Sequence, residues 1–334
     1  QELLLSAEGH LSATTDGIEA VRQTEVSFLI VPTPSESNGN FSLNHIMDAL
    51  KQVGKGIKKK DSRHLVVITS TVVPGSTERE IIPRLEAVSG KKCGSEFGVC
   101  YSPVFVALGN VINDLLVPDL ILIGESDPGA GDLLEKLYMN IKENSSSIER
   151  MNIINAEVAK LAVNTFVTTK MSFANMLSEI CERIPGGNAY RVIDAIGSDT
   201  RIGKLYIKPG VAYGGPCFPR DNKALCYLAE SVSAEATLAL ATDKVNRHQN
   251  DRMLALVLGL LSEGRKVSIL GLSYKPGTDI VEEAAGLVLA QNLIDCGSEV
   301  RVYDPKALEH AKKVLGGDLY YATSLTECID GADI

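Results

Sequence analysis

One stretch in the middle of the chain constrains the fold more than any other. Residues 155–182 contain neither glycine nor proline, and their apolar residues recur at helical spacing. Because glycine and proline are the residues that most weaken a helix, this run of 28 residues predicts a single helix well above the average length. The apolar positions are Ala156, Ala159, Val163, Phe166, Phe173, Met176, Leu177 and Ile180.

Short apolar runs alternate with helical patterns on both sides of this stretch. Strands of four to six apolar residues that alternate with helices predict a parallel sheet covered by helices on both faces. The expected strands cover residues 26–31, 65–68, 97–100, 120–123, 267–270 and 300–303. The expected helices cover about 43–57, 129–139, 235–261 and 281–295.

This pattern predicts an α/β protein with three parts. We expect an α/β domain over residues 1–150, a central helical domain over 151–262, and a second α/β domain over 263–334. In the first part, Thr77 and Glu80 have the spacing of a capping box at the start of a helix.

Composition excludes several classes of protein. The net charge is −9, from 33 basic and 42 acidic residues, without the basic footprint of a nucleic-acid binder. No apolar run approaches the ~20 residues that a membrane helix needs, so we expect no membrane partner. The seven cysteines form no C-x-x-C pair, which favours reduced thiols in a cytoplasmic protein over a disulfide framework or a zinc ribbon. The five histidines lack ligand spacing, so no metal site is expected.

The strongest chemical signal is the segment from Gly214 to Asp221, which reads GGPCFPRD. A cysteine attacks carbon as a thiolate, which nearby positive charge favours, and Arg220 follows Cys217 closely. The glycines keep the backbone thin enough for a substrate to approach, and Asp221 is placed to act as a base. The alternative is a glycine turn beside a buried cysteine, the commoner fate of a lone cysteine.

Three further groups of residues suggest a site, and each has an ordinary alternative. Lys160 and Asn164 are four residues apart, so they share a helix face and suit an oxyanion, but a solvated lysine above a helix-face asparagine is the commoner case. Ser70 and Thr71 follow a strand, at the sheet edge where ligands gather, or they simply form a turn. The third group comprises Arg201, Lys208 and Lys275, which could neutralise phosphates or be surface cations.

Taken in order, seven segments resemble the UDP-glucose/GDP-mannose dehydrogenase family over essentially the whole chain. They are VPTP (31–34), STVVPGST (70–77), AEVAKLAVNTF (156–166), GSDTRIG (197–203), PGVAYGGPCFPRD (209–221), GLSYKPGT (271–278) and YDP (303–305). The resemblance implies two Rossmann-like, doubly wound domains joined by a helical dimerisation domain, and hence a homodimer. It also implies two oxidations of a nucleotide sugar, from alcohol to carboxylate, with two NAD.

The resemblance assigns roles to individual residues. Cys217 would be the nucleophile that carries a thiohemiacetal and then a thioester, which water cleaves. Asp221 would assist proton transfer, Lys160 and Asn164 would stabilise the oxyanion, and Thr71 would order a catalytic water. The substrate would be held by Arg201 (across a dimer), Lys208, Lys275, Tyr213, Gly214, Gly215 and Phe105. NAD would be held by Val31, Pro32, Thr33, Ser70, Thr71 and Arg220.

Three positions depart from the family pattern. Val104 stands where the family usually has a glutamate, and valine cannot activate water, which puts thioester hydrolysis in question. Glu282 stands where an arginine near the cofactor phosphates is frequent, and Arg220 replaces a lysine. The chain also lacks G-x-G-x-x-G, so we expect the first βαβ unit to lie upstream of Gln1 and the rest of the last domain to follow Ile334. On that basis the chain alone should bind NAD poorly.

UDP-glucose is the favoured substrate, because Phe218 after the nucleophile resembles the UDP-glucose branch. A UDP-N-acetylhexosamine of the mannosamine type is the alternative within the class. A two-electron 3-hydroxyacid dehydrogenase would share the Lys/Asn pair but would not need Cys217. A non-catalytic nucleotide-sugar binder is the third possibility, motivated by Val104 and Glu282.

Overall fold

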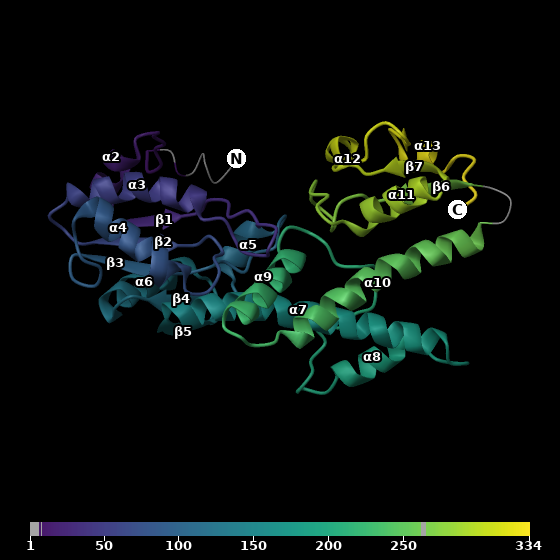
Figure 1. Ribbon diagram of the computed structural model, residues 1–334, viewed down its shortest axis with the longest axis horizontal. Helices are drawn as coiled ribbons and strands as arrows, with labels where there is room; N and C mark the ends of the chain where they lie inside the picture. Colours follow the sequence, from purple (N-terminus) through teal and green to yellow (C-terminus); the bar gives the residue numbers. More distant parts are fainter. Residues whose placement is uncertain (1–6, 8, 262–264) are drawn as a thin grey trace. The chain divides into compact units, whose positions relative to one another are not determined.

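The computed structural model describes residues 7, 9–261 and 265–334 (Figure 1). The expected boundary between residues 262 and 263 lies outside the described residues. The chain forms two compact units, Gln1–Lys160 and Leu161–Ile334. Helix α7 (Ile153–Glu182) begins in the first unit and continues into the second, which confirms the long helix expected over 155–182. None of the described helices is both long and apolar enough to span a membrane.

The first unit contains a five-stranded sheet in the order β1-β2-β3-β4-β5. Strands β1 (Val26–Leu29), β2 (His64–Ile68) and β3 (Phe97–Tyr101) are parallel, and β4 (Leu120–Glu125) pairs in parallel with β5 (Ser147–Asn152). However, β3 and β4 are antiparallel, so the prediction of a wholly parallel sheet is wrong at this pair. The reason is that only the six-residue helix α5 (Val111–Leu116) separates them, and the chain turns back instead of crossing the sheet.

Helices cover both faces of this sheet, as the alternation predicted. One face of β2, with Val66 and Ile68, packs on α3 (Asn44–Lys58) and α4 (Ile82–Ser89). The other face, with Leu65 and Val67, packs on α6 (Pro128–Ile141). A further short helix, α2 (Gly17–Gln23), packs on α3 through Val21 and adds to the first layer.

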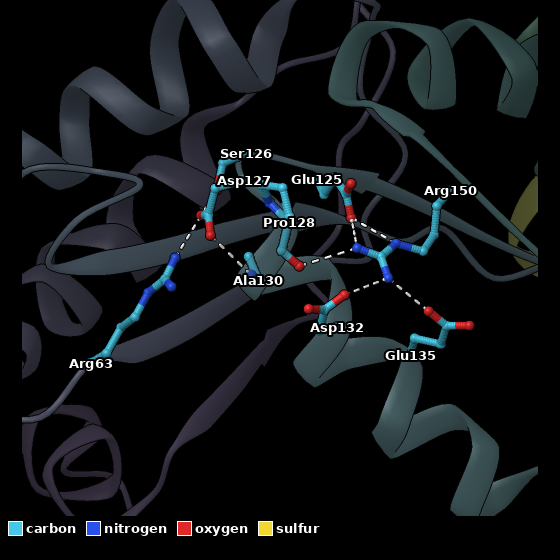
Figure 2. A network of polar contacts seen from close by, with 9 residues as sticks. All are labelled: Arg63, Glu125, Ser126, Asp127, Pro128, Ala130, Asp132, Glu135 and Arg150. Atoms are coloured by element: carbon cyan, nitrogen blue, oxygen red, sulfur yellow. Dashed lines mark hydrogen bonds and ion pairs between the residues drawn. The ribbon is translucent and has the colours of Figure 1, made fainter.

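An ion-pair network joins β4, β5, α6 and the residue before β2 (Figure 2). Arg150 on β5 contacts the carboxylates of Glu125, Asp132 and Glu135 at 2.7, 2.7 and 2.8 Å. Arg63, just before β2, pairs with Asp127 at 2.6 Å, and Asp127 in turn caps α6. Because β4 runs against β3, the chain after β4 continues toward the edge where β1–β3 begin: the Ser126 N–H donates to the Val99 carbonyl, and Asp127 reaches Arg63. This edge is opposite the edge expected to bind ligands. We therefore regard the network as structural.

The second unit combines helices with a small parallel sheet. After α7 come α8 (Ala189–Gly197), α9 (Phe218–Ser231) and α10 (Thr237–Leu260). The sheet has the order β6-β7-β8, with every pair parallel. Its elements are β6 (Lys266–Leu270), α11 (Ala285–Asp295), β7 (Glu299–Tyr303), α12 (Leu308–Leu315), β8 (Tyr320–Tyr321) and α13 (Leu325–Ile329). The predicted α/β class with two sheet domains and intervening helices is confirmed.

The capping box predicted from Thr77 and Glu80 does not form. Residues Thr77–Ile81 make a π-helical turn, η1, before α4, and Ser76 at its start makes no side-chain cap. The cap comes instead from Glu157 on α7, which accepts hydrogen bonds from the backbone N–H groups of Gly75 (2.5 Å) and Thr77 (3.0 Å). Glu157 is fully buried, and burial raises the pKa of its carboxyl group, which these N–H donors partly offset.

We expect Glu157→Gln to destabilise the first unit by about 1–3 kcal/mol, because the amide NH₂ cannot accept a hydrogen bond and one buried N–H is left unpaired. Urea unfolding measures the change. The matched control is Glu80→Gln, because Glu80 is exposed and should change the free energy of unfolding by less than about 0.5 kcal/mol. Equal effects of the two substitutions would contradict the assignment of the cap.

A second buried polar cluster lies near the start of β2. His64 is 1% exposed and lies 2.9 Å from the Ser27 hydroxyl and 3.0 Å from the Lys60 ammonium. Burial, and next the positive charge of Lys60, lower the pKa of His64 to about 4. An unfolded histidine binds a proton near pH 6.5, so between pH 6.5 and 4 the unfolded state binds more protons than the folded state.

Stability should therefore fall as the pH drops through this window. Between pH 7 and pH 5 we expect His64 to contribute a loss of about 2 kcal/mol in the free energy of unfolding. Urea unfolding at both pH values should show a smaller loss in His64→Gln than in the wild type. His45 is exposed, so His45→Gln should keep the wild-type pH dependence; the same dependence in both variants would refute the prediction.

Candidate active site

One face of α7 is polar and buried along most of the helix. Six polar side chains follow one another at spacings of three or four residues, and none is more than 9% exposed. Burying a polar group without a partner is costly, so each should find one. The six are Glu157, Lys160, Asn164, Thr168, Ser172 and Asn175. The alternative of a solvated Lys160 above a surface Asn164 is therefore wrong.

In the first unit, Lys160 contacts the segment that follows β3. Its ammonium donates a hydrogen bond to the carbonyl oxygen of Val104 at 2.9 Å and lies 4.5 Å from the centre of the Phe105 ring. A cation over an aromatic face is held by the ring's quadrupole. The structure thus brings Lys160 and Phe105 together, as expected for neighbouring site residues. Val104 contributes its backbone here, so the contact does not depend on a glutamate at this position.

Hydroxyl groups join the segments that follow β1 and β2. The Ser70 hydroxyl accepts a hydrogen bond from the Val31 N–H (2.9 Å) and donates one to the Val31 carbonyl (2.7 Å). The Thr33 hydroxyl donates to the Thr71 carbonyl at 2.7 Å. The two segments therefore form one unit at the edge where β1 and β2 end, with Pro32 exposed and Thr71 partly exposed.

In the second unit, Asp221 connects α7 to the cysteine. The Asn164 amide donates to the Asp221 carboxylate at 2.6 Å, and the Asp221 N–H donates to the Cys217 carbonyl at 2.8 Å. Asp221 is 1% exposed, and Arg220 lies 3.6 Å from its other carboxylate oxygen. Cys217 itself is exposed and directly precedes α9, so the alternative of a buried packing cysteine is wrong.

Neutral amides hold the Gly-rich loop between α8 and α9. Asn175 accepts from the Gly210 N–H (2.8 Å), and Gln249 donates to the Gly210 carbonyl (2.6 Å). Asn246 makes the same pair of bonds to Tyr213, at 2.8 Å to its N–H and 2.9 Å to its carbonyl. Amides do not titrate, so they fix the loop at any pH.

Sequence reasoning missed these amides. Asn175 continues the three- and four-residue spacing that contains Lys160 and Asn164, so extending that spacing along the helix would have found it. Asn246 and Gln249 lie on α10, far from α7 in the sequence, and no local pattern marks them.

Burial raises the pKa of the Tyr213 phenol, whose hydroxyl oxygen accepts a hydrogen bond from the Asn222 amide.

The three expected phosphate ligands have different surroundings in the described part of the chain. Arg201 is exposed and pairs with Asp199 at 2.6 Å. Lys208 is exposed, and the ammonium of Lys275 lies 5.8 Å from the centre of the Tyr274 ring. Among the described residues, no hydrogen bond or ion pair joins these three side chains to one another, so their joint role stays a prediction. The described residues also contain no cluster of three His, Cys, Asp or Glu that could hold a metal ion.

The space beside Gly214 and Gly215 is filled by protein. The Gly215 N–H donates to the Glu282 carbonyl at 2.7 Å, and a Cβ on Gly214 would lie 2.1 Å from the Glu283 carbonyl oxygen. These glycines therefore permit a close approach of backbone to backbone. The side chain of Glu282 is exposed, so its charge points to solvent.

Comparison with known proteins places the whole chain in one family. Residues 1–142, 154–248 and 268–334 match the NAD binding, central and UDP binding domains of the UDP-glucose/GDP-mannose dehydrogenase family. The chain is 36% identical over 330 residues to UDP-glucose 6-dehydrogenase AglM of Haloferax volcanii, covering 98% of this chain and 76% of that protein. It is also 36% identical over 308 residues to GDP-mannose 6-dehydrogenase of Pseudomonas syringae pv. tomato, covering 92% and 69%.

A solved structure agrees. The structure of a UDP-glucose dehydrogenase from the hyperthermophilic archaeon Pyrobaculum islandicum matches with a TM-score of 0.89 at 36% identity, covering 98% of this chain and 74% of that one. The chain therefore belongs to the UDP-glucose/GDP-mannose dehydrogenase family of nucleotide-sugar 6-dehydrogenases and carries its NAD binding domain.

Proposed function

We propose that this protein oxidises the C6 alcohol of UDP-glucose to the carboxylate, with Cys217 as the nucleophile. The observation that carries the proposal is the chain of contacts from Asn164 through buried Asp221 to the backbone of exposed Cys217. A buried carboxylate four residues after an exposed thiol that precedes a helix offers covalent catalysis by cysteine a nearby acid–base group and a helix N-terminus. The proposed parts are an NAD-binding domain over 1–150, a helical domain over 151–262 and a UDP-sugar-binding domain over 263–334.

The segments after β1 and β2 suit NAD. Their hydroxyls at Thr33 and Ser70 are used to join the two segments, which leaves Val31, Pro32 and Thr71 partly or fully exposed and uncharged at the sheet edge. NAD bound there would accept a hydride in each of the two oxidations. Arg220 would add a positive charge.

The residues of the chain supply binding, nucleophile and proton transfer. After the alcohol becomes an aldehyde, Cys217 Sγ adds to its carbon, and the carbonyl oxygen becomes the hydroxyl of a thiohemiacetal. Lys160 and the second N–H of the Asn164 amide stabilise the negative charge on that oxygen. After the second oxidation, water attacks the thioester and the thiolate leaves. Asp221 accepts a proton from the water that Thr71 orders, because Val104 has no group to do so.

UDP recognition would come from the second unit. Lys275, Arg201 and Lys208 carry the charge that a diphosphate needs. Tyr213, whose ring meets Phe218 edge to face at 6.1 Å, would line the sugar side with Phe105, whereas Gly214 and Gly215, which pack against Glu283 and Tyr274, would shape the loop that carries Cys217. We favour UDP-glucose over a UDP-N-acetylhexosamine because Phe218 directly follows the nucleophile. A catalytically impaired nucleotide-sugar binder is the alternative that Val104 supports.

The protein given UDP-glucose should reduce two NAD per sugar, and Cys217→Ser should lower turnover on the order of 10³-fold or more, since a serine at this position lacks a thiolate. NADH absorbance together with the amount of uronate measures both. GDP-mannose is the matched control and should give little NADH. One NADH per sugar, or full turnover by Cys217→Ser, would rule out the mechanism. A stable adduct on Cys217 without release of uronate would favour the impaired alternative.

We also propose a homodimer that forms through α7. Its face away from the buried polar residues carries four exposed apolar side chains, Phe166 (68% exposed), Phe173 (44%), Met176 (40%) and Ile180 (46%). Apolar side chains that line one helix face at this exposure are typical of an interface. Arg201 would then reach the site of the partner.

Replacing Phe173 with glutamate should halve the mass seen by light scattering, because a charge would be buried in the interface. Leu325 is 49% exposed on α13, and Leu325→Glu is the control that should leave the mass unchanged. A wild-type protein that is monomeric at micromolar concentration would contradict the dimer.

A further inference from the structure

We propose that Tyr274, which belongs to the segment after β6, is a positioning residue for Cys217. That Cys217 is the nucleophile rests on the proposed function. The contact between Tyr274 and the cysteine loop is a property of the fold and does not depend on it. The proposal explains why Gly215, in the loop before Cys217, is a glycine.

The ring of Tyr274 lies against Gly215, two residues before Cys217. A Cβ on Gly215 would be 2.5 Å from the ring carbon Cδ2, closer than real Cβ contacts allow. Gly215 also has φ +87°, a left-handed conformation that favours glycine. The ring therefore covers the backbone of Gly215, and any larger residue there would push the ring and the loop apart.

One backbone carbonyl holds the same loop, and a second lies close against it. The Glu282 carbonyl accepts the Gly215 N–H at 2.7 Å, and the Glu283 carbonyl lies where a Cβ of Gly214 would be. Glu283 has φ +47°, a strained conformation for a non-glycine residue, which the surrounding structure must stabilise. Strain at this point indicates that the position of this carbonyl is fixed by its neighbours rather than by local preference.

Tyr274 is itself held in place. Its N–H donates to the Ile280 carbonyl at 2.9 Å. The residue before it, Ser273, donates its N–H to Asp304 at 3.1 Å. Burial disfavours the charge of Asp304, but hydrogen bonds from four backbone N–H groups lower its pKa overall. A charged, buried carboxylate thus anchors the segment that carries the ring.

Electrostatics agree with the geometry. Burial raises the pKa of Tyr274, and negative charge on Cys217 raises it further, so the thiol and the phenol are close enough to interact. The phenol stays protonated and neutral at physiological pH. Because Cys217 directly precedes α9, fixing the backbone at Gly215 sets where its sulfur points. A nucleophile displaced by about 1 Å loses on the order of 10²-fold in rate.

Alkylation of the protein with iodoacetamide tests the proposal without cofactor or substrate. Peptide mass spectrometry follows each cysteine separately, with exposed Cys296 as the internal standard and buried Cys100 and Cys328 as reporters of unfolding. In Tyr274→Ala the loop loses the surface that holds it, so the thiol is reached from more directions. We expect the labelling rate of Cys217 relative to Cys296 to rise at least about threefold, whereas Tyr274→Phe, which keeps the ring, should stay within about twofold.

Gly215→Ala disturbs the same contact from the side of the loop, because its Cβ would collide with the Tyr274 ring. It should therefore raise the labelling rate of Cys217 relative to Cys296, as Tyr274→Ala does. If Tyr274→Ala exposes Cys100 and Cys328, the smaller truncation Tyr274→Leu takes its place.

In the activity assay, kcat of Tyr274→Ala should fall roughly tenfold or more, whereas Tyr274→Phe should keep a kcat close to that of the wild type. A purely structural role would lower the melting temperature without changing the Cys217 to Cys296 ratio, and that result would overturn the proposal. A wild type that is inactive but shows the expected labelling would contradict the proposed function alone.

Discussion

The structure depends on one constraint, the need to satisfy six polar side chains that are buried along α7. A buried donor or acceptor without a partner costs about 1–3 kcal/mol, so each of these residues fixes the segment that satisfies it. In the first unit, Glu157 holds the backbone of Gly75 and Thr77, and Lys160 holds that of Val104. In the second unit, Asn164 holds Asp221 and Asn175 holds Gly210. One helix face therefore fixes two segments in each unit.

Each type of partner suits its task. The carboxylate of Glu157 accepts two backbone N–H groups at once, which caps the turn before α4. The amides around Gly210 and Tyr213 satisfy both backbone groups of a residue without adding charge near the proposed diphosphate site. Asp221 is an acidic residue whose backbone N–H contacts the Cys217 carbonyl. Asn164 and Arg220 both approach its carboxylate. Charge is thus kept where proton transfer is proposed, and neutral groups fix the remaining loop.

Local patterns predicted much of the fold. The strands β1–β4 and β6–β7 are short apolar runs, and α7 is a long run without glycine or proline, so period and length identify them. β5 was missed because its residues, such as Glu149 and Arg150, alternate between exposed and partly buried, as in an edge strand. The antiparallel pairing of β3 with β4 and the cap by Glu157 were also missed. Both depend on contacts between distant parts of the chain, about 80 residues apart for the cap, which no local pattern records.

In the candidate site too, the sequence identified some residues, and only the structure revealed the contacts of others. Cys217, Asp221 and the Lys160–Asn164 pair stand out by residue type and by family resemblance, and the structure buries all but Cys217. The glycines beside Cys217 suggested room for a substrate, whereas in the structure they admit the Tyr274 ring and the backbone near Glu283. The sequence shows that Gly214 and Gly215 have no side chain, but only the packing shows which groups occupy the space beside them.

Amide hydrogen exchange measures the central claim most directly. The N–H groups of Gly75, Thr77 and Gly210 lie outside regular α-helices and strands, yet each donates to a buried side chain of α7. We predict that these three amides are protected in the native protein as strongly as amides in the middle of α7. Exchange at rates typical of open loops would show that the polar face of α7 does not hold these segments.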